Sequence, residues 1–327
     1  MLDSFLKVFE EWFAGYTAEI RSRISGASIV RSGSASEQNM TEWGWDIKEL
    51  PAVLDEVDLK IEHTYRVRDR CREIAESIIH GYSDSTRSVY GFSDRDVEIA
   101  SVIGLLHDLG RFRQALMFGT MDDRITGNHG EMSADIFTHD VPKTGLNKKE
   151  IQIITDALRY HNVYKLPAVL TKKGAALNLL FTQIVRDGDK LDIFKFYASK
   201  ENNTEGRAFR FIMSEGEGDY SPDMLAGVLK AKNLKVSGIR NKKDRKLMQV
   251  SLVYDMNFDY SFRWMLKKDY LAHITGVANG SADDVMQRVY DYATEWMRGK
   301  INDSHDETIS RNKGESQKRA LRGVWAQ

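Results

Sequence analysis

The chain has 327 residues, and its 47 basic and 48 acidic side chains leave a formal net charge of −1. A length of this order suggests about two domains, with enough buried apolar surface to fold without a disulfide or a structural metal. The single cysteine, Cys71, excludes an intramolecular disulfide and a cysteine-rich zinc site. The balanced charge argues against nucleic acid as the main partner. We expect a cytoplasmic protein without membrane contact, because no apolar run reaches the ~20 residues that span a bilayer and the N-terminus lacks the features of a signal peptide.

Helical periodicity dominates the sequence, and alternating strand-type patterns are scarce, which predicts an all-α fold. We expect a loop over 26–40 and a polar excursion over 201–226. We expect helices over 4–22, 51–79, 94–110 with Gly110 as its end, 129–138, 148–161, 177–198, 223–232, 259–275 and 282–299. The predicted domains are an N-terminal helix and loop over 1–50, a helical core over 51–200, a C-terminal helical extension over 201–301 and a polar tail over 302–327.

Several ionisable residues fall at positions predicted to face the helical core. One inward histidine is more often a satisfied core residue than a ligand, but here histidines and aspartates recur on separate helices. A buried carboxylate is costly unless it is paired or binds a metal. We therefore predict that these groups surround a divalent ion between helices. They are His63, His107, Asp108, His129, His161, Asp187 and Asp189.

The order of these residues and the sequence around them resemble those of the HD-domain superfamily of metal-dependent phosphohydrolases over about residues 50–200. The resemblance is carried by three segments, which read His63-Thr-Tyr-Arg-Val67, Leu105-Leu-His-Asp-Leu-Gly-Arg-Phe112 and Val185-Arg-Asp-Gly-Asp-Lys-Leu-Asp192. It implies an all-helical HD domain that holds one or two divalent metals and hydrolyses a phosphate ester through a metal-activated water.

Two further segments, 129–137 and 159–162, are similar to those in which binuclear HD proteins place additional histidines. The resemblance then implies six ligands, with Asp108 as the bridge between two metals. The implied ligands are His63, His107, Asp108, His129, His161 and Asp189. Asp187 fits the apolar stripe slightly better than Asp189, whereas the Gly-Asp-Lys-Leu register favours Asp189. Nitrogen and oxygen donors without thiolate suit Mn²⁺, Fe²⁺, Co²⁺, Ni²⁺ or Mg²⁺, and the sequence does not choose among them.

A phosphate substrate also requires positive charge, and cations flank the motifs. Besides Asp108, we predict catalytic roles for Arg111, as a bidentate phosphate contact, and for Lys190. Arg66 and Arg113 are further candidates for phosphate contact. No general acid is identified, and either Glu131 or a metal-bound water would serve.

The sequence differs from the motifs of two known HD subfamilies, which argues against their activities for this chain. The chain lacks the paired histidines and Gly-Tyr-Pro stretch of cyclic-di-GMP phosphodiesterases, and the acidic extension of alarmone hydrolases. The remaining interpretation is a stand-alone phosphohydrolase acting on a nucleotide or another small phosphate ester. The alternatives are an HD-type diiron oxygenase and a non-catalytic nucleotide sensor. The sequence leaves open a homo-oligomer.

Eight cations lie within residues 230–246 against one acidic residue, Asp244. As a hypothesis, this basic stripe steers a polyanionic substrate or touches nucleic acid. The alternative is a solvated face or a mobile loop, which we favour because no aromatic residues interleave with the cations.

Overall fold

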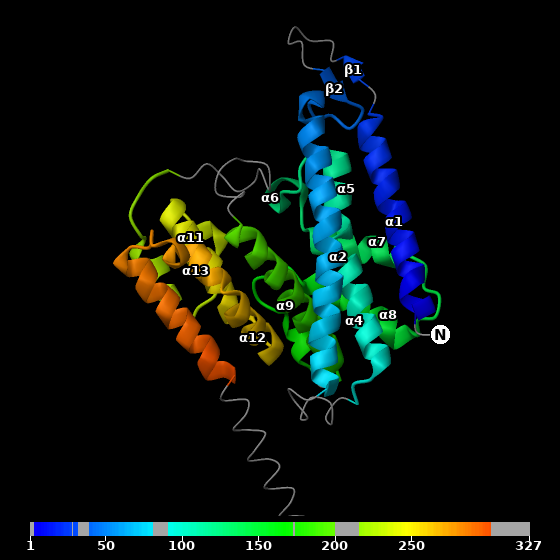
Figure 1. The fold of residues 1–327 in the computed structure, drawn as a ribbon. Coiled ribbons are helices and arrows are strands. Elements are labelled where there is room, and N and C mark those ends of the chain that lie inside the picture. The colour runs from blue at the N-terminus through cyan, green and yellow to red at the C-terminus, as the bar shows by residue number, and fades with distance from the viewer. Residues whose placement is uncertain are drawn as a thin grey trace, which may run out of the picture. The chain divides into compact units, whose positions relative to one another are not determined.

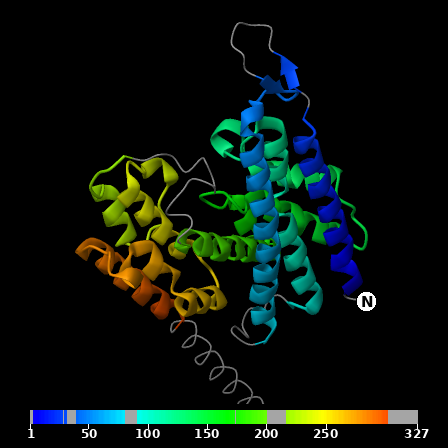
Figure 2. The same cartoon turned by 45° about the horizontal axis from the view of Figure 1, so that its top comes forward.

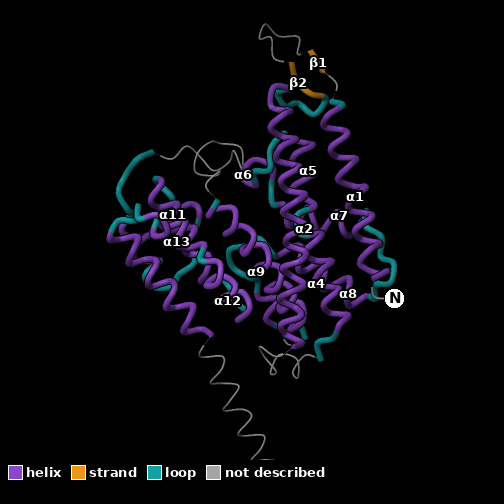
Figure 3. The backbone as a smooth tube through the Cα atoms, viewed as in Figure 1, coloured by secondary structure: helices purple, strands orange, loops and turns teal. Residues whose placement is uncertain are grey.

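The computed structural model describes residues 3–27, 29–31, 39–80, 91–172, 174–199 and 216–301. Within these ranges the fold is almost wholly helical, which confirms the predicted all-α class (Figure 3). The exception is a pair of short antiparallel strands, β1 (Ile29–Arg31) and β2 (Asn39–Thr41), in a region where the sequence predicted only a loop. The predicted tail over 302–327 lies outside the described residues.

The chain forms two compact units, one from residues 1–73 and 95–215 and the other from residues 74–94 and 216–327. The predicted four-part division of the chain remains a prediction. The helices of the first unit are α1 (Asp3–Ser25), α2 (Leu50–His80, which continues into the second unit), α4 (Asp94–Leu106), α5 (Leu109–Phe118), α6 (Asp123–Thr126), α7 (His129–His139), α8 (Lys148–Tyr160) and α9 (Ala176–Ala198).

Long-range packing within the first unit brings helices from distant parts of the sequence together (Figures 1 and 2). Helix α7 packs against α5 and α8, and α8 packs against α9. Helix α1 packs on α5, where Phe13 and Phe112 meet edge to face with ring centroids 5.7 Å apart. Buried aromatic pairs of this kind stabilise a core beyond the area that they bury.

Local sequence signals explain where the helices of this unit begin. Asn128 caps α7 through hydrogen bonds from the backbone amides of Gly130 and Glu131. Asn147 and Glu150 form a capping box at the start of α8. The helices predicted over 51–79, 129–138, 148–161 and 177–198 are confirmed to within one or two residues.

The predicted end of a helix at Gly110 is wrong. Helix α4 ends at Leu106, and α5 begins at Leu109, so that His107 and Asp108 form the turn between them. Gly110 instead lies in the first turn of α5. A Cβ at this position would lie 2.3 Å from the carbonyl oxygen of His129, so glycine is required there for the close approach of α5 and α7.

The second unit contains α10 (Pro222–Val228), α11 (Lys242–Ser251), α12 (Asp259–Lys268), α13 (Tyr270–Thr275) and a helix over 284–301. The helix predicted over 259–275 is broken, because Asp269 adopts the left-handed conformation at φ 49°. The helix predicted over 223–232 stops at Val228. Asp244 is fully buried, and its carboxylate accepts hydrogen bonds from the amide and hydroxyl of Ser221.

The basic stripe over 230–246 includes the start of α11, where no helix was predicted. Three of its cations form ion pairs within the same unit. Arg240 Nη1 lies 3.0 Å from Asp223 Oδ1, and Lys243 Nζ lies 3.1 Å from Asp219 Oδ1. Lys242 pairs with Glu217. This pairing reduces the charge that the stripe presents to a polyanion.

Candidate metal centre

Five elements of the first unit contribute the six predicted metal ligands. His63 lies on α2, and His107 and Asp108 lie in the turn between α4 and α5. His129 is the first residue of α7, His161 follows the last residue of α8, and Asp189 lies on α9. The first five are buried, whereas the side chain of Asp189 is 20% exposed. Of the six side chains, that of Asp189 is therefore the most open to solvent.

Glycines beside these residues allow the helices to approach one another closely. A Cβ on Gly104 of α4 would lie 2.8 Å from Arg68 Cα on α2. A Cβ on Gly188 of α9 would lie 2.8 Å from the sulfur of Cys71, which is also on α2. Because real Cβ atoms do not make such short contacts, these positions accept only glycine without a shift of the helices. Each glycine is within three residues of a predicted ligand, so close packing places the ligands.

Asp108 presents its two carboxylate oxygens to two different pairs of histidines. Its Oδ2 lies 3.1 Å from His107 Nε2 and 3.5 Å from His63 Nε2. Its Oδ1 lies 3.3 Å from His129 Nε2 and 3.8 Å from His161 Nε2. A carboxylate in this position can contact cations on both of its sides.

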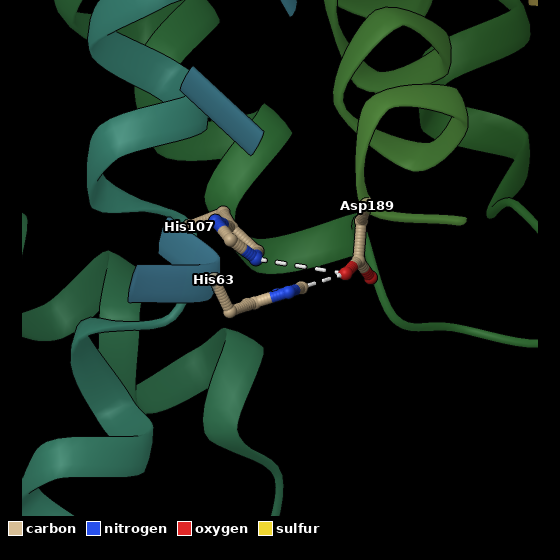
Figure 4. Close-up of side chains that lie close together, drawn as sticks. All are labelled: His63, His107 and Asp189. Atoms are coloured by element: carbon tan, nitrogen blue, oxygen red, sulfur yellow. Dashed lines mark ion pairs between the residues drawn. The ribbon is translucent and has the colours of Figure 1, made fainter. Parts of the chain in front are cut away.

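Asp189 faces the first pair of histidines. Its Oδ1 lies 3.2 Å from His63 Nε2 and 3.8 Å from His107 Nε2 (Figure 4). Two groups of donor atoms each lie close enough together to hold a metal ion: His63, His107 and Asp189 form one, and His107, Asp108 and His161 form the other.

The hydrogen bonds behind the histidines set their tautomers. His107 Nδ1 lies 2.8 Å from the Gly104 carbonyl oxygen, and His161 Nδ1 lies 2.8 Å from that of Leu158. A carbonyl oxygen only accepts, so each Nδ1 carries the hydrogen and each Nε2 presents a lone pair to the centre.

His63 and His129 are held from behind by carboxylates instead. His63 Nδ1 lies 2.8 Å from Asp192 Oδ2, and His129 Nδ1 lies 2.7 Å from Asp123 Oδ2. The buried Nε2 atoms of His63 and His107 find no hydrogen-bond partner among the described residues. Unpartnered nitrogens that converge on carboxylates fit the coordination of a metal ion.

Burial and charge set the protonation of the centre. Burial and the neighbouring histidines lower the pKa of His161 to about 3, and burial together with Arg111 lowers the pKa of His129. Burial and Lys60 act to lower the pKa of His63, but the carboxylates of Asp108, Asp189 and Asp192 around the ring outweigh them and raise it to about 9. Burial also acts against ionisation of Asp108, yet His107 and Lys60 beside it hold its pKa well below the usual range. The carboxylates are ionised, and two imidazoles are neutral near pH 7.

The remaining predicted site residues have other surroundings. Arg111 Nη1 lies 3.0 Å from Asp123 Oδ1, and its Nε lies 3.9 Å from Asp108 Oδ1. Lys190 is buried and donates to the Arg186 carbonyl of its own helix, and its contact with phosphate remains a prediction.

Asp187 is fully buried and belongs to neither of the two groups that could hold a metal ion. Arg113 pairs with Asp140, and Glu131 pairs with Arg159. None of these contacts joins the residue to the histidines.

Three residues of the centre were missed in the sequence. Lys60 is buried, and its ammonium lies 2.7 Å from Asp108 Oδ2. Its position three residues before His63 places it on the same helix face, and Asp192 stands in the same relation to Asp189. Helical spacing therefore contained a signal for both. The sequence contained no such signal for Asp123. This residue lies on a different helix from His129, and only the tertiary structure brings the two side chains together.

A pocket opens beside His63, between α2 and α9. Its lining combines apolar side chains with an arginine and two acids, and consists of Glu56, Leu59, His63, Arg66, Asp192, Ile193 and Phe196. A pocket of this composition next to the candidate metal centre can receive the organic part of a ligand.

One comparison with known protein families gives a match, and it covers part of the chain. The model of the HD domain matches residues 61–193, a range that contains all six predicted ligands. No curated protein and no solved structure shows significant similarity to the chain. Among the described residues, no helix is long and apolar enough to cross a membrane. Residues 61–193 of this chain therefore match an HD domain.

Proposed function

We propose that this protein is a metal-dependent phosphohydrolase that acts on a nucleotide or another small phosphate ester. HD domains are generally metal-dependent hydrolases and usually bind divalent metals. The observation that carries the proposal is the position of Asp108, whose two oxygens each face a pair of histidine Nε2 atoms.

The proposed ligands for one or two divalent ions are His63, His107, Asp108, His129, His161 and Asp189. Divalent ions, when bound there, supply Lewis-acid activation of a phosphoryl group and of water. The donor set contains imidazole nitrogen and carboxylate oxygen only, which suits Mn²⁺, Fe²⁺, Co²⁺, Ni²⁺ or Mg²⁺. The buried donors also keep the reacting atoms away from bulk water.

Two cations adjoin Asp108 and are positioned to attract a phosphate. Lys60 Nζ lies 2.7 Å from Asp108 Oδ2, and Arg111 Nε lies 3.9 Å from Asp108 Oδ1. Both side chains are largely buried, so solvent screens their charge only weakly. We propose that they contact the phosphoryl oxygens and hold them beside the proposed metal ligands.

The pocket beside His63 supports a substrate with a flat or apolar organic part. Leu59, Ile193 and Phe196 supply apolar surface, and Arg66 adds a guanidinium. An aromatic ring such as Phe196 offers a face on which a nucleobase can stack. A nucleotide has both an organic part that fits this pocket and a phosphate that fits the cations near Asp108.

One second candidate, a diiron oxygenase, is favoured by a specific observation. Four histidines and two carboxylates converge, and such a nitrogen- and oxygen-rich set also suits iron. The two functions share ligands and differ in the co-reactant that they require.

The deciding experiment combines metal analysis with a substrate screen. The purified chain is stripped with a chelator, reloaded with each of the five metals, and assayed for phosphate release from nucleoside mono-, di- and triphosphates. Metal-dependent release, lost in an Asp108→Asn variant, supports the proposal. Turnover that requires iron and O₂ would replace it with the oxygenase. Nucleotide binding without turnover under any metal would replace it with a sensor.

A further inference from the structure

Two of the four histidines are supported by the same three-part arrangement. Asp192 accepts from His63 Nδ1, and Arg66 holds the Asp192 carboxylate through Nε at 2.6 Å and Nη2 at 3.0 Å. On the other side of Asp108, Asp123 accepts from His129 Nδ1 at 2.7 Å. These two histidines are the ones whose Nδ1 atoms do not bond a main-chain carbonyl.

Arg111 completes the second arrangement. Its Nη1 donates to Asp123 Oδ1 at 3.0 Å and also to the Met121 carbonyl, which anchors the guanidinium in the loop before α6. Gln114 donates to the same Asp123 oxygen at 2.9 Å. Arg111 and Gln114 thus both hold the carboxylate while it faces the imidazole.

The two arrangements lie on opposite sides of the centre. His63 faces Asp108 Oδ2, and His129 faces Asp108 Oδ1. A carboxylate behind an imidazole fixes the ring and makes the other nitrogen a stronger donor to a metal. An arginine that binds the carboxylate keeps it ionised and in place.

We propose that Asp192 and Asp123 are positioning residues, each of which acts through one histidine and sets the metal affinity of one side of the centre. Arg66 and Arg111 hold these two carboxylates. The proposal rests on the proposed metal centre. It assigns to each side of Asp108 its own support, so that the two sides respond to substitution independently.

Metal affinity in the full-length chain tests this proposal without any activity assay. The chelator-stripped protein is titrated with Co²⁺ and followed by calorimetry and by the visible absorbance of the bound ion. Asp192→Asn and Asp123→Asn should each weaken Co²⁺ binding about 10- to 100-fold. Asp58→Asn is the matched control: Asp58 pairs with Arg21 at 2.8 and 3.1 Å on the surface of the same unit, so its loss should leave the affinity unchanged.

Combined variants separate positioning from a general structural role. In a His129→Ala background, Asp123→Asn should have no further effect on Co²⁺ affinity, whereas Asp192→Asn should keep its full effect. A His63→Ala background should give the reverse pattern. If Asp123→Asn weakens binding equally with and without His129, it acts on the fold and the proposal is wrong. Full affinity in both single variants would also overturn it.

If the histidine variants do not bind Co²⁺ at all, a measurement on the metal-free protein still tests the proposal. Nitrogen-15 NMR of the imidazole rings reports which nitrogen carries the hydrogen. Asp123→Asn should alter the signals of His129 and leave those of His63 unchanged, and Asp192→Asn should do the opposite. Changes spread over all four rings would contradict the proposal.

These experiments can show separately whether the roles of Asp192 and Asp123 are wrong and whether the proposed function is wrong. If the wild-type chain binds Co²⁺ but hydrolyses no phosphate ester, the phosphohydrolase is excluded while the roles of Asp192 and Asp123 are still decided by the titrations. If the wild-type chain binds none of the divalent ions, both proposals fail.

Discussion

His129 and His161 face each other in the buried centre with their Nε2 atoms 3.0 Å apart. Each ring uses Nδ1 elsewhere, toward Asp123 and toward the Leu158 carbonyl. Because burial lowers the pKa of both rings, neither nitrogen carries a proton near neutral pH. Two lone pairs at this distance repel each other unless a cation binds beside them. A metal ion bound at this centre would relieve the contact, and it would also give a partner to the Nε2 atoms of His63 and His107, which have none among the described residues.

Metal binding should therefore stabilise the folded chain. A divalent ion at about 100 times its dissociation constant adds about 2.7 kcal/mol to the free energy of unfolding. For a chain of 327 residues that raises the unfolding midpoint by roughly 4 °C. Calorimetry of the chelated protein with and without Mn²⁺ measures the shift. His161→Ala should remove most of it, and an undiminished shift in that variant would contradict the assignment.

Asp108 should be the most sensitive single residue of the centre. We expect Asp108→Ala, like His107→Ala, to weaken metal binding by more than about 100-fold, because it removes a proposed ligand rather than a residue behind one. Turnover should be lost while circular dichroism still reports a helical protein. Full activity in Asp108→Ala would refute the metal assignment.

Asp189 and Asp187 should behave differently although they are neighbours on α9. Asp189 Oδ1 lies 3.2 Å from His63 Nε2, whereas Asp187 is fully buried outside both candidate groups. Asp189→Asn should lower metal affinity, and Asp187→Asn should alter stability while leaving the affinity of the folded fraction unchanged. Calorimetric titration of both variants checks this, and the opposite pattern would make Asp187 the ligand.

Gly110→Ala should destabilise the protein by about 1–3 kcal/mol, because the new methyl group overpacks the contact between α5 and α7. Its Cβ would lie 2.3 Å from the His129 carbonyl oxygen. Urea unfolding measures the loss. Gly15→Ala on α1 is the control, since its Cβ meets nothing within 4 Å, and it should be neutral or stabilising by roughly 0.5–1 kcal/mol. Equal effects at the two positions would exclude the packing explanation.

The stability of the metal-free chain should peak near pH 6.5. The folded state raises the pKa of His63 from 6.5 to about 9, so the stabilisation by its proton is complete below 6.5 and is lost as the pH rises toward 9. The folded state lowers the pKa of His161 to about 3. The unfolded chain therefore binds more protons between pH 6.5 and 3, and stability falls as the pH drops through that range.

Urea midpoints measured in chelator from pH 4 to 10 test this profile. Metal binding must displace the proton of His63, so Co²⁺ affinity should also increase with pH up to about 9. Stability that rises steadily from pH 6.5 to 9 would show that the charge on His63 does not contribute.

Local sequence patterns were enough to predict many of the helices. The helical repeat from Val67 to Ile78 is sufficient to predict α2, because side chains three and four residues apart share a face. The same repeat places His63 inward. The break between α4 and α5 was not predicted. Gly110 was expected to end a helix, whereas in the structure a glycine is required there because α5 and α7 lie in close contact.

The sequence by itself determined which residue types face the core of each helix, including the histidines and aspartates of the centre, because helical periodicity is local. Only the tertiary structure decided that Asp108 divides its oxygens between two pairs of histidines, that Lys60 adjoins it, and that Asp123 supports His129. These relations depend on how closely helices distant in sequence approach one another. That distance is set by contacts at glycines such as Gly104 and Gly188, which no single helix encodes.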